Sequence, residues 1–445
     1  MKLPLTPPRL DSILERHGAK AILDIEAAVD VNGRYEHWDH LRHLAPPHGL
    51  SAEAWWGRIK FSRIAASRPL PLVGRDGTPL RLVVTDSMLK RLHFLDREAA
   101  GTILGLQRED DARSRDDYLL RSLIEEAMTS SQLEGASTTR EIAKEMLRSG
   151  RAPRDHSERM IFNNFAAMRE LRRWRDEPLT PERVFEIHRI LCADTFDDPT
   201  KAGRFRHSDE RIQVVDNRDG TVLHDPPLAV ELAQRLERLC AFANDVDSRS
   251  FVHPVIRAIV LHFQIGFDHP FVDGNGRTAR ALFYWSMLRA DYWLTEFLSI
   301  SSVLRKAPAQ YSRAYQYVET DDLDVSYFVD HQLDVLVKAV DGLRGYLDRK
   351  QAERFEVERL LKPGSKLSRS LNHRQRALLV HALKNTGHSY RIAEHQRTHG
   401  VTYQTARTDL LQLAKLKLLQ QFQQGKAFVF VARADLAAHL RGRAR

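Results

Sequence analysis

The chain has 445 residues, of which 42% are hydrophobic and 29% are charged, and its formal net charge is +9. This length suits two or three globular domains. No apolar run approaches the roughly 20 residues of a membrane-spanning helix, so we expect no such helix. The two cysteines, Cys192 and Cys240, cannot form a disulfide framework and fit a reducing compartment. The N-terminus lacks an apolar core followed by a small-residue cleavage site, so we expect a cytoplasmic protein.

The positive charge is concentrated near the C-terminus. Residues 365–445 hold 15 Lys/Arg and 3 Asp/Glu, a net charge of +12, which leaves −3 for residues 1–364. A local basic excess favours a polyanion partner for this segment more than a whole-chain average would.

Residues 1–110 are expected to form a mixed α/β region. Ser51 is typical of an N-cap and Glu53 of a first turn, so a helix is predicted to begin there. The segment 79–85, PLRLVVT, follows a glycine-rich turn and predicts a strand. We expect the tryptophans of this region to anchor the core or a domain interface: Trp38, Trp55 and Trp56.

From about residue 115 to residue 350 the periodicity is helical. One helix is predicted to begin after Thr180 as N-cap, with Pro181 at its first position. The segment 211–225 alternates in polarity and carries an Asp-Gly turn signal, which predicts a β-hairpin among the helices. The sequence KPGSK at 362–366 is the predicted linker to the basic C-terminal segment.

The stretch HPFVDGNGRTAR, residues 269–280, follows an apolar helical segment and gathers unusual chemistry. Gly274 and Gly276 precede a helix-forming stretch. Glycine backbone at a helix N-terminus supplies N–H donors and a positive dipole for phosphate. Arg277 and Arg280 are three residues apart on one helix face, so both could reach the same polyphosphate.

Two further residues frame this loop. The Asp273 carboxylate could hold Mg²⁺ against phosphate oxygens. His269, with an ordinary pKa of about 6.5, suits taking a proton from a hydroxyl nucleophile. An EF-hand is excluded because the fifth, sixth and twelfth positions counted from Asp273 are Arg277, Thr278 and Tyr284. No Walker A lysine or dinucleotide fingerprint occurs. The alternative to a phosphate-binding site is an ordinary surface turn followed by a helix cap.

The stretch resembles the Fic-domain signature, His-x-Phe-x-Asp/Glu-Gly-Asn-Gly-Arg-x-x-Arg, at every fixed position. The resemblance implies a mainly α-helical core with a β-hairpin flap, and transfer of AMP from ATP to a hydroxyl side chain of a target protein. It implies that His269 is the base and that Asp273 binds Mg²⁺. The other motif residues would hold the phosphates or clamp the triphosphate: Gly274, Asn275, Gly276, Arg277 and Arg280.

Related families leave some alternatives open. Death-on-curing toxins, a kinase branch, carry a lysine at the position of Gly276, and this difference favours nucleotidyl transfer over phosphoryl transfer. Members that transfer phosphocholine are not excluded by the loop alone.

The predicted helix 117–135 resembles the Fic inhibitory pattern, Ser/Thr-x-x-x-Glu-Gly/Asn, at Ser130, Glu134 and Gly135. In the family this glutamate pairs with the last arginine of the signature, here Arg280, and keeps it from the γ-phosphate. The resemblance therefore implies that the chain inhibits itself. From the residues alone, Glu134 would be a solvated charge before a glycine cap, as most such residues are. Some related enzymes use this glutamate to remove AMP, which stays an alternative.

The predicted hairpin at 211–225 occupies the place of the family's target-docking flap. There the backbone of a target protein would add to an exposed strand edge and present its hydroxyl to His269. An ordinary surface hairpin is the alternative. The segment AGRFR, 202–206, also resembles family members, and Tyr311 could contact the adenine or pack on a helix face.

Residues 367–435 resemble a winged helix-turn-helix, with helices expected at 373–384, 389–398 and 402–417 and a β-wing including 426–432. The residues that would meet base edges of DNA lie early in the third helix: Thr402, Gln404, Thr405 and Arg407. Such modules also form protein-contact or dimer surfaces, so DNA binding and a homodimer both stay open. We expect Asp409 to make a structural pairing.

The sequence thus predicts three regions: an N-terminal Fic-associated region (1–110), a Fic domain (111–355) and a winged helix-turn-helix (367–435). The predicted function is a protein adenylyltransferase inhibited by Glu134. A de-adenylylating Fic enzyme is one alternative. A DNA-binding transcriptional regulator whose Fic core senses nucleotide is the other.

Overall fold

A computed structural model describes residues 2–22, 28–47, 49–100, 112–216, 218–246, 250–361, 370–385, 387–424, 427–433 and 435–444. The chain divides into two compact units. The first comprises Met1–Thr102 and Arg121–Val340, and the second comprises Ile103–Leu120 and Asp341–Arg445. The predicted linker at 362–366 and the predicted boundary between residues 110 and 111 lie outside the described residues.

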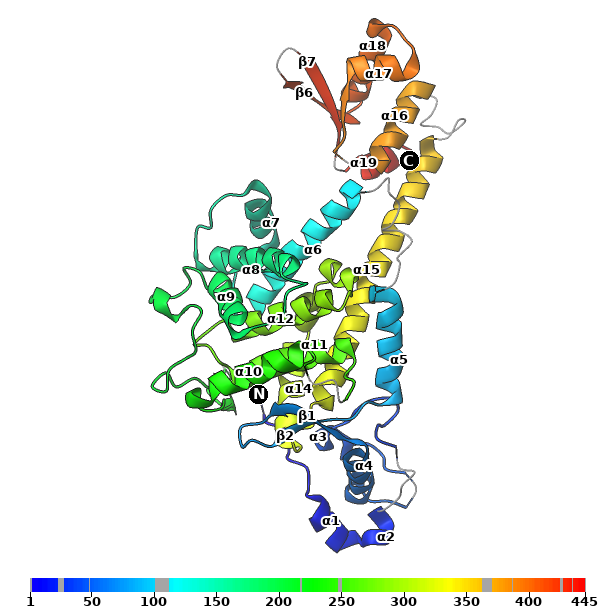
Figure 1. The fold of residues 1–445 in the computed structure, drawn as a ribbon. Coiled ribbons are helices and arrows are strands. Elements are labelled where there is room, and N and C mark those ends of the chain that lie inside the picture. Colours follow the sequence, from blue (N-terminus) through cyan, green and yellow to red (C-terminus); the bar gives the residue numbers. More distant parts are fainter. Residues whose placement is uncertain are drawn as a thin grey trace. The chain divides into compact units, whose positions relative to one another are not determined.

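The first unit is mainly helical (Figure 1). Its helices are α1 (Leu10–His17), α2 (Ala19–Ile22), α3 (Trp38–Leu41), α4 (Ala52–Ala66), α5 (Asp86–Leu95), α7 (Arg140–Ser149), α8 (His156–Arg173), α9 (Pro181–Leu191), α10 (Leu232–Ala243), α11 (Pro254–Asp268), α12 (Asn275–Arg289), α13 (Ile300–Leu304) and α14 (Pro308–Thr320). Two longer helices have residues in both units: α6 (Ala112–Leu133) and α15 (Ser326–Leu361). Short helical turns occur at Asp96–Ala100, Pro199–Lys201, Ala229–Glu231 and Trp293–Phe297.

Among the described residues of the first unit, the strands form two small antiparallel hairpins. Strand β1 (Arg68–Val73) pairs with β2 (Pro79–Leu82), which confirms the strand predicted at the start of 79–85. Strand β3 (Val214–Val215) pairs with β4 (Val222–His224), as the alternation in 211–225 predicts. We call the β3–β4 hairpin, residues 211–225, the flap.

Local capping sets the helix boundaries where the sequence predicts them. The Ser51 hydroxyl accepts the Ala54 N–H at 3.1 Å and opens α4. The Thr180 hydroxyl accepts the Arg183 N–H at 3.3 Å, and Pro181 begins α9. Each cap satisfies a backbone donor that has no partner inside the helix.

Helices α11 and α12 pack against each other at the centre of the first unit, with α10 beside α11 and with α8 and α9 beside α12 (Figure 1). Almost every side chain of α11 is buried, as expected for a mainly apolar helix at the centre of a core. The loop 269–274 joins the C-terminal end of α11 to the N-terminal end of α12. The predicted motif therefore lies where two buried helices meet.

The N-terminal region has its own apolar cluster and packs on the α14–α15 connection. Trp38 and Trp56 are buried in this cluster and Trp55 is partly buried against it, so the prediction of core anchors is confirmed. A buried ion pair joins Lys60 Nζ to Asp321 Oδ1 at 2.5 Å. A second polar contact joins α4 to the first turn of α15: the guanidinium of Arg63 donates to the Tyr327 hydroxyl at 2.8 Å.

The second unit contains α16 (His373–Lys384), β5 (Ser389–Arg391), α17 (Ile392–His399), α18 (Tyr403–Lys415), β6 (Leu419–Gln424), β7 (Ala427–Ala432) and α19 (Leu436–Ala444). Its strands form an antiparallel sheet in the order β5-β7-β6. The prediction of a helix from residue 389 is wrong at its start. Buried Tyr390 is flanked by exposed Ser389 and Arg391, and this alternation suits a strand paired with β7.

Polar contacts fix the helices of the second unit. The Thr402 hydroxyl caps α18, and Gly400 adopts a left-handed conformation with φ of 61° at the end of α17. The buried Asp409 carboxylate accepts hydrogen bonds from Asn372 at 2.6 Å and Arg374 at 2.7 Å, which confirms its structural pairing. The assignment of this unit as a winged helix-turn-helix stays a prediction.

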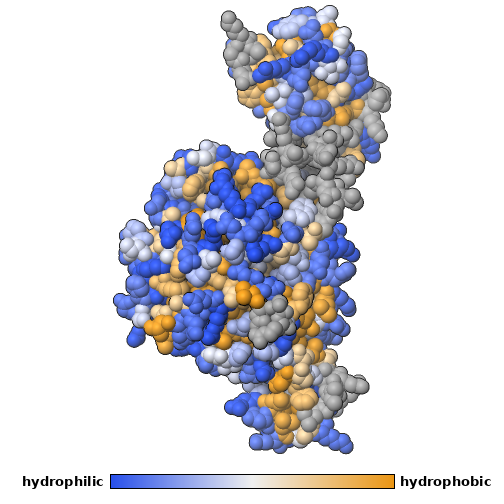
Figure 2. All heavy atoms as spheres, in the orientation of Figure 1, coloured by the Kyte–Doolittle hydropathy of each residue, from blue (hydrophilic) through white to orange (hydrophobic). Residues whose placement is uncertain are grey.

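The surface is mixed in character. Figure 2 shows one face, on which hydrophilic side chains are interspersed with smaller hydrophobic areas. Within the described ranges, no helix combines the length and apolar character needed to cross a membrane.

Candidate active site

His269 ends helix α11 in a left-handed conformation, with φ of 43° and ψ of 58°. Its backbone N–H donates to the Ile265 carbonyl at 3.1 Å, which closes the last helical turn. Its ring Nδ1 lies 2.5 Å from the Gly266 carbonyl oxygen. A carbonyl only accepts, so Nδ1 carries the hydrogen and Nε2 keeps a free lone pair.

The surroundings of His269 favour this neutral form. Burial lowers the pKa of His269 to about 4, although the bond to Gly266 opposes the change, and the nearby His224 contributes to the lowering. The imidazole is therefore a proton acceptor at neutral pH, as a general base must be.

A cavity of about 370 Å³ brings several predicted site residues together. His269, Gly276 and Arg280 line it from the α11–α12 junction, and Glu134 lines it from the end of α6. The remaining walls come from the flap and from α14, and include Val214, Val215, Leu223, His224, Tyr311, Tyr315 and Glu319. The described residues around this cavity do not include Asp273, Gly274, Asn275 or Arg277.

The start of α12 offers backbone donors to an anion. No hydrogen bond among the described residues uses the N–H groups of residues 275–277, which we call the phosphate cradle. Gly274 adopts φ of 82°, and a Cβ there would lie 2.6 Å from Cys192 Sγ, so only glycine fits. The Asn275 side chain exchanges two 2.9 Å hydrogen bonds with the backbone of Phe271. Asn275 thus shapes the loop, and its predicted phosphate contact would come from the backbone.

Glu134 lies over the phosphate cradle. A Cβ on Gly276 would be only 2.1 Å from Glu134 Oε1. The same oxygen accepts a 2.7 Å hydrogen bond from Arg280, whose guanidinium also donates to the Ser130 hydroxyl at 2.8 Å. Gly135 follows with φ of 96°, which lets the chain turn after α6. An internal carboxylate therefore lies at the anion-binding end of α12.

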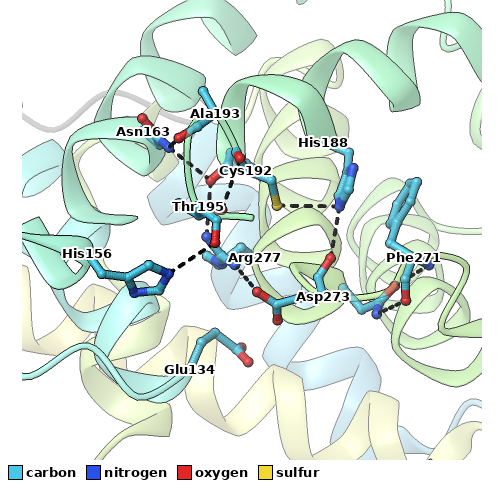
Figure 3. Close-up of polar contacts among 12 residues, drawn as sticks. Glu134, His156, Asn163, His188, Cys192, Ala193, Thr195, Phe271, Asp273 and Arg277 are labelled. Carbon is cyan, nitrogen blue, oxygen red and sulfur yellow. Dashed lines mark hydrogen bonds and ion pairs between the residues drawn. The ribbon is translucent and has the colours of Figure 1, made fainter. Parts of the chain in front are cut away.

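Arg277 points away from this cavity. Its guanidinium donates to the Leu191 carbonyl at 3.0 Å and to the Asp273 carboxylate at 2.8 Å, and its side chain is fully buried (Figure 3). These contacts brace the loop, so the predicted clamp on a triphosphate by Arg277 stays a prediction. Tyr311 lies on the cavity wall, with its hydroxyl 2.7 Å from His262 Nε2, and its contact with adenine also stays a prediction.

Asp273 fits a magnesium ligand. Its side chain is 55% exposed and only one oxygen is bonded to Arg277. Mg²⁺ in nucleotide sites is commonly held by one or two carboxylates together with substrate phosphates. Within the part of the chain that the structure describes, no group of three or more His, Cys, Asp or Glu side chains is placed to hold a metal ion by itself.

Sequence reasoning missed two residues that hold the loop. His188 Nδ1 accepts the Gly203 N–H at 2.9 Å, so Nε2 carries the hydrogen and donates to the Asp273 carbonyl at 2.8 Å (Figure 3). Burial lowers the pKa of His188 to about 4, so the ring stays neutral and keeps its single hydrogen on Nε2. Arg206 Nε donates to the His269 carbonyl at 2.8 Å. The only sequence signal was the AGRFR segment that contains Gly203 and Arg206.

Comparison with known proteins agrees with this geometry. Residues 178–287 match the Fic/DOC family. The protein adenylyltransferase Fic of Drosophila grimshawi is 35% identical over 114 residues, which are 26% of this chain and 21% of that protein. The protein of the same name from Drosophila melanogaster is 33% identical over 114 residues, with the same shares of each chain. The match thus spans about a fifth of the length of these curated relatives.

Among solved structures, a Fic family protein from Desulfovibrio desulfuricans G20 aligns over 78% of this chain and 95% of that chain, with a TM-score of 0.49 and 18% sequence identity. The family match at residues 178–287 shows that the chain contains a Fic/DOC domain, and proteins named protein adenylyltransferase Fic are homologues of this domain.

Proposed function

We propose that the protein transfers AMP from ATP to a tyrosine, threonine or serine hydroxyl of a target protein, and that Glu134 inhibits this reaction. One observation carries the proposal. An internal carboxylate lies over a helix N-terminus with free N–H donors, beside an imidazole whose Nε2 is a free proton acceptor. A site that holds a carboxylate in this way suits the phosphates of a nucleotide. The adenylyltransferase names of the homologues support the choice of ATP.

The residues of the site fit an in-line displacement. His269 Nε2 would take the proton from the target hydroxyl while the oxygen of that hydroxyl bonds to the α-phosphorus of ATP. The bond from that phosphorus to pyrophosphate then breaks, and pyrophosphate leaves. The Gly266 carbonyl, bonded to Nδ1–H, stabilises the protonated ring. Donors of the phosphate cradle and Arg280 offset the charge that develops on the phosphates.

Asp273 would hold Mg²⁺, which supplies positive charge against the phosphate oxygens when it is bound. His188 and Arg277 keep Asp273 in place by bonds to its backbone carbonyl and its carboxylate. These contacts fix the loop before substrate arrives, so little reorganisation is needed during the reaction.

The contact between Glu134 and Arg280 explains the proposed inhibition. Arg280 is buried, and its two donor nitrogens on this side are bonded to Ser130 and Glu134. A phosphate cannot share the space over Gly276 with the carboxylate, because a single Cβ there would already overlap it. Productive ATP binding therefore requires the Glu134 carboxylate to leave this position.

The flap supports docking of a target protein. Val215 and Val222 are each 41% exposed on its two short strands, close to the cavity that contains His269. An extended target segment could add to a strand edge and bury these side chains.

The proposal is tested with labelled ATP, Mg²⁺ and a cell extract as the source of targets. We expect the Glu134→Gly variant to label more protein than the wild type, and the Glu134→Gly/His269→Ala variant to label none. Glu141→Gly, which removes an exposed glutamate on α7, is the matched control and should behave as the wild type. Equal labelling by wild type and Glu134→Gly would exclude inhibition by Glu134. Labelling that survives loss of His269 would exclude the mechanism.

The same samples separate adenylylation from removal of AMP. Target protein is first labelled by the Glu134→Gly variant, then separated from ATP and incubated with the wild-type protein. Release of AMP by the wild type, but not by His269→Ala, would favour the de-adenylylating alternative.

A second candidate function rests on the C-terminal unit. Thr402 and Gln404 are exposed at the start of α18, Thr405 and Arg407 are partly exposed beside them, and the segment 365–445 carries the excess positive charge. This arrangement supports DNA binding by α18. The full chain should retain duplex DNA at low salt, lose it as salt rises, and bind more weakly as Arg407→Ala. Absence of retention at low salt would exclude this function.

A further inference from the structure

The flap is held to the rest of the first unit by the side chain of His224, the last residue of β4. The side chain is buried, with 9% of the residue exposed. Its Nδ1 lies 2.8 Å from Glu319 Oε2 on α14, and its Nε2 lies 2.6 Å from the Phe267 carbonyl oxygen near the end of α11. The ring centroid is 6.4 Å from that of His269.

Both partners of this ring are hydrogen-bond acceptors. A carbonyl and an ionised carboxylate only accept, and a neutral imidazole has a single N–H, so it could satisfy one of them. Both contacts are made when the ring carries two N–H groups and a positive charge, or when Glu319 carries the proton. Imidazole is the stronger base, which assigns the proton to His224. Although burial opposes the charge, the contacts with Glu319 and Phe267 raise the pKa of His224.

The charged surroundings favour a cation at this position. Three carboxylates lie near the ring, one each on α14, on α11 and in the flap. The carboxylates on α11 and in the flap each have an arginine partner, whereas the carboxylate on α14, Glu319, pairs with the ring itself. The facing groups are Glu319 of α14, Asp268 of α11 (bonded to Arg235 of α10), His269 after α11, and Asp225 of the flap (bonded to Arg75 of the β1–β2 turn). Arg81 of β2 and Asp322 after α14 line the same hollow, and Arg206 is bonded to the His269 carbonyl.

We propose that His224 is a positioning residue which, as a buried imidazolium, ties the flap to α11 and α14 and keeps the neighbouring His269 neutral. This inference rests on the proposed function. A positive charge near His269 disfavours a second one, which lowers the pKa of His269 and preserves its proton-accepting form. Because the pKa of His224 is raised, both bonds are present below that pKa. One of them is lost as pH rises through that pKa, and the flap loosens there.

The protonation state can be measured without any activity. The full chain is labelled with ¹⁵N in its histidines, and the His224 signals are those missing from His224→Gln. At pH 7 we expect two protonated ring nitrogens in the wild type. In Glu319→Gln the amide can donate to Nδ1 while Nε2–H still donates to Phe267, so a neutral ring is expected there. A single protonated nitrogen in the wild type at pH 7 would overturn the inference.

Asp225→Asn is the matched control for Glu319→Gln. It removes a carboxylate of the same charge from the flap, but one that makes no hydrogen bond to the ring. We expect its His224 ring to keep both protons. Loss of a proton in this control would show that net charge alone, and not the bond to Glu319, sets the protonation state of His224, and would overturn the inference.

Kinetics then test the effect on His269. In the Glu134→Gly background, His224→Gln should move the acid limb of kcat/KM upward by about 0.5 to 2 pH units, as expected for a unit charge 6.4 Å away at an effective dielectric of roughly 80 to 20. A merely structural defect would lower the rate at every pH and leave the limb in place, which would overturn the proposal. No transfer by any variant would instead refute the proposed function, while the NMR result would still decide the charge of His224.

Discussion

Glu134 can be tested for two separate effects, its charge and the space it fills. Glu134→Gln keeps the volume over Gly276 but removes the charge, whereas Glu134→Gly removes both. In the structure the Glu134 side chain is 28% exposed and the side chain of its partner Arg280 is 2% exposed. The Glu134 Oε1 atom lies 2.7 Å from a guanidinium nitrogen of Arg280. Since the arginine is almost fully buried, the bond is shielded from solvent on one side and should be stronger than a surface ion pair.

The size of the effect follows from this bond. A hydrogen bond between charged groups contributes about 1.5–3 kcal/mol, which is a factor of about 10 to 150 in the equilibrium between occupied and open phosphate cradle. Apparent affinity scales with the fraction of binding-competent protein. Glu134→Gly should therefore bind ATP about 10 to 150 times more tightly than the wild type, and Glu134→Gln should fall between them because the amide still fills the space.

Titration calorimetry with a non-hydrolysable ATP analogue and Mg²⁺ measures these affinities directly. Thermal unfolding of each variant shows that the chain remains folded, and Glu141→Gln on α7 controls for loss of a surface carboxylate. Equal dissociation constants for the wild type and Glu134→Gly would refute the reasoning. Equal constants for the Gln and Gly variants would show that charge alone accounts for the inhibition.

Four further outcomes follow from the site. Gly274→Ala forces an alanine into positive φ against Cys192 and should lower the unfolding free energy by about 2–4 kcal/mol in urea titrations; an unchanged midpoint would contradict this. His188→Ala leaves the Asp273 carbonyl without its donor and opens a cavity, so urea titration should show a loss of about 3 kcal/mol, and a loss below 1 kcal/mol would argue against the brace. AMP transfer by the Glu134→Gly variant should fall only below about pH 4, where His269 gains a proton, and a fall near its ordinary pKa would show that burial does not act as described. Excess EDTA should stop transfer, and Asp273→Asn should slow it at least tenfold if Asp273 holds Mg²⁺; full activity in EDTA would exclude the metal.

Sequence patterns over a few residues predicted the features that depend on interactions between residues close together in the sequence. The caps at Ser51 and Thr180, the hairpin at 211–225 and the helix after Gly276 all follow from residues a few positions apart. Helical phase also placed Arg277 and Arg280 on one face, but three residues turn the helix by 300°, so the two side chains diverge by about 60°. That difference directs one toward Leu191 and the other toward Ser130 and Glu134.

Contacts between distant segments could not be predicted in this way. His188 is 85 residues from Asp273, and Arg206 is 63 residues from His269, so no periodicity links them. Their hydrogen bonds exist because α9 and the segment after it pack beside α12. The strand at Ser389–Arg391 likewise needs β7, more than 35 residues later, as its partner.

The cavity around His269 is formed by separate stretches of the chain, and not all of them lie within the segment that matches the family. Residues 178–287 carry the imidazole, the phosphate cradle and the flap, but Glu134 comes from before this stretch and Tyr311 and Glu319 come from after it. A graft of the matched segment into a foreign scaffold would keep the imidazole and the backbone donors, yet lose the carboxylate of Glu134 and one wall of the cavity. Conversely, the end of α6 could be exchanged by itself, which would change the group that lies over Gly276 and leave His269 and the start of α12 in place.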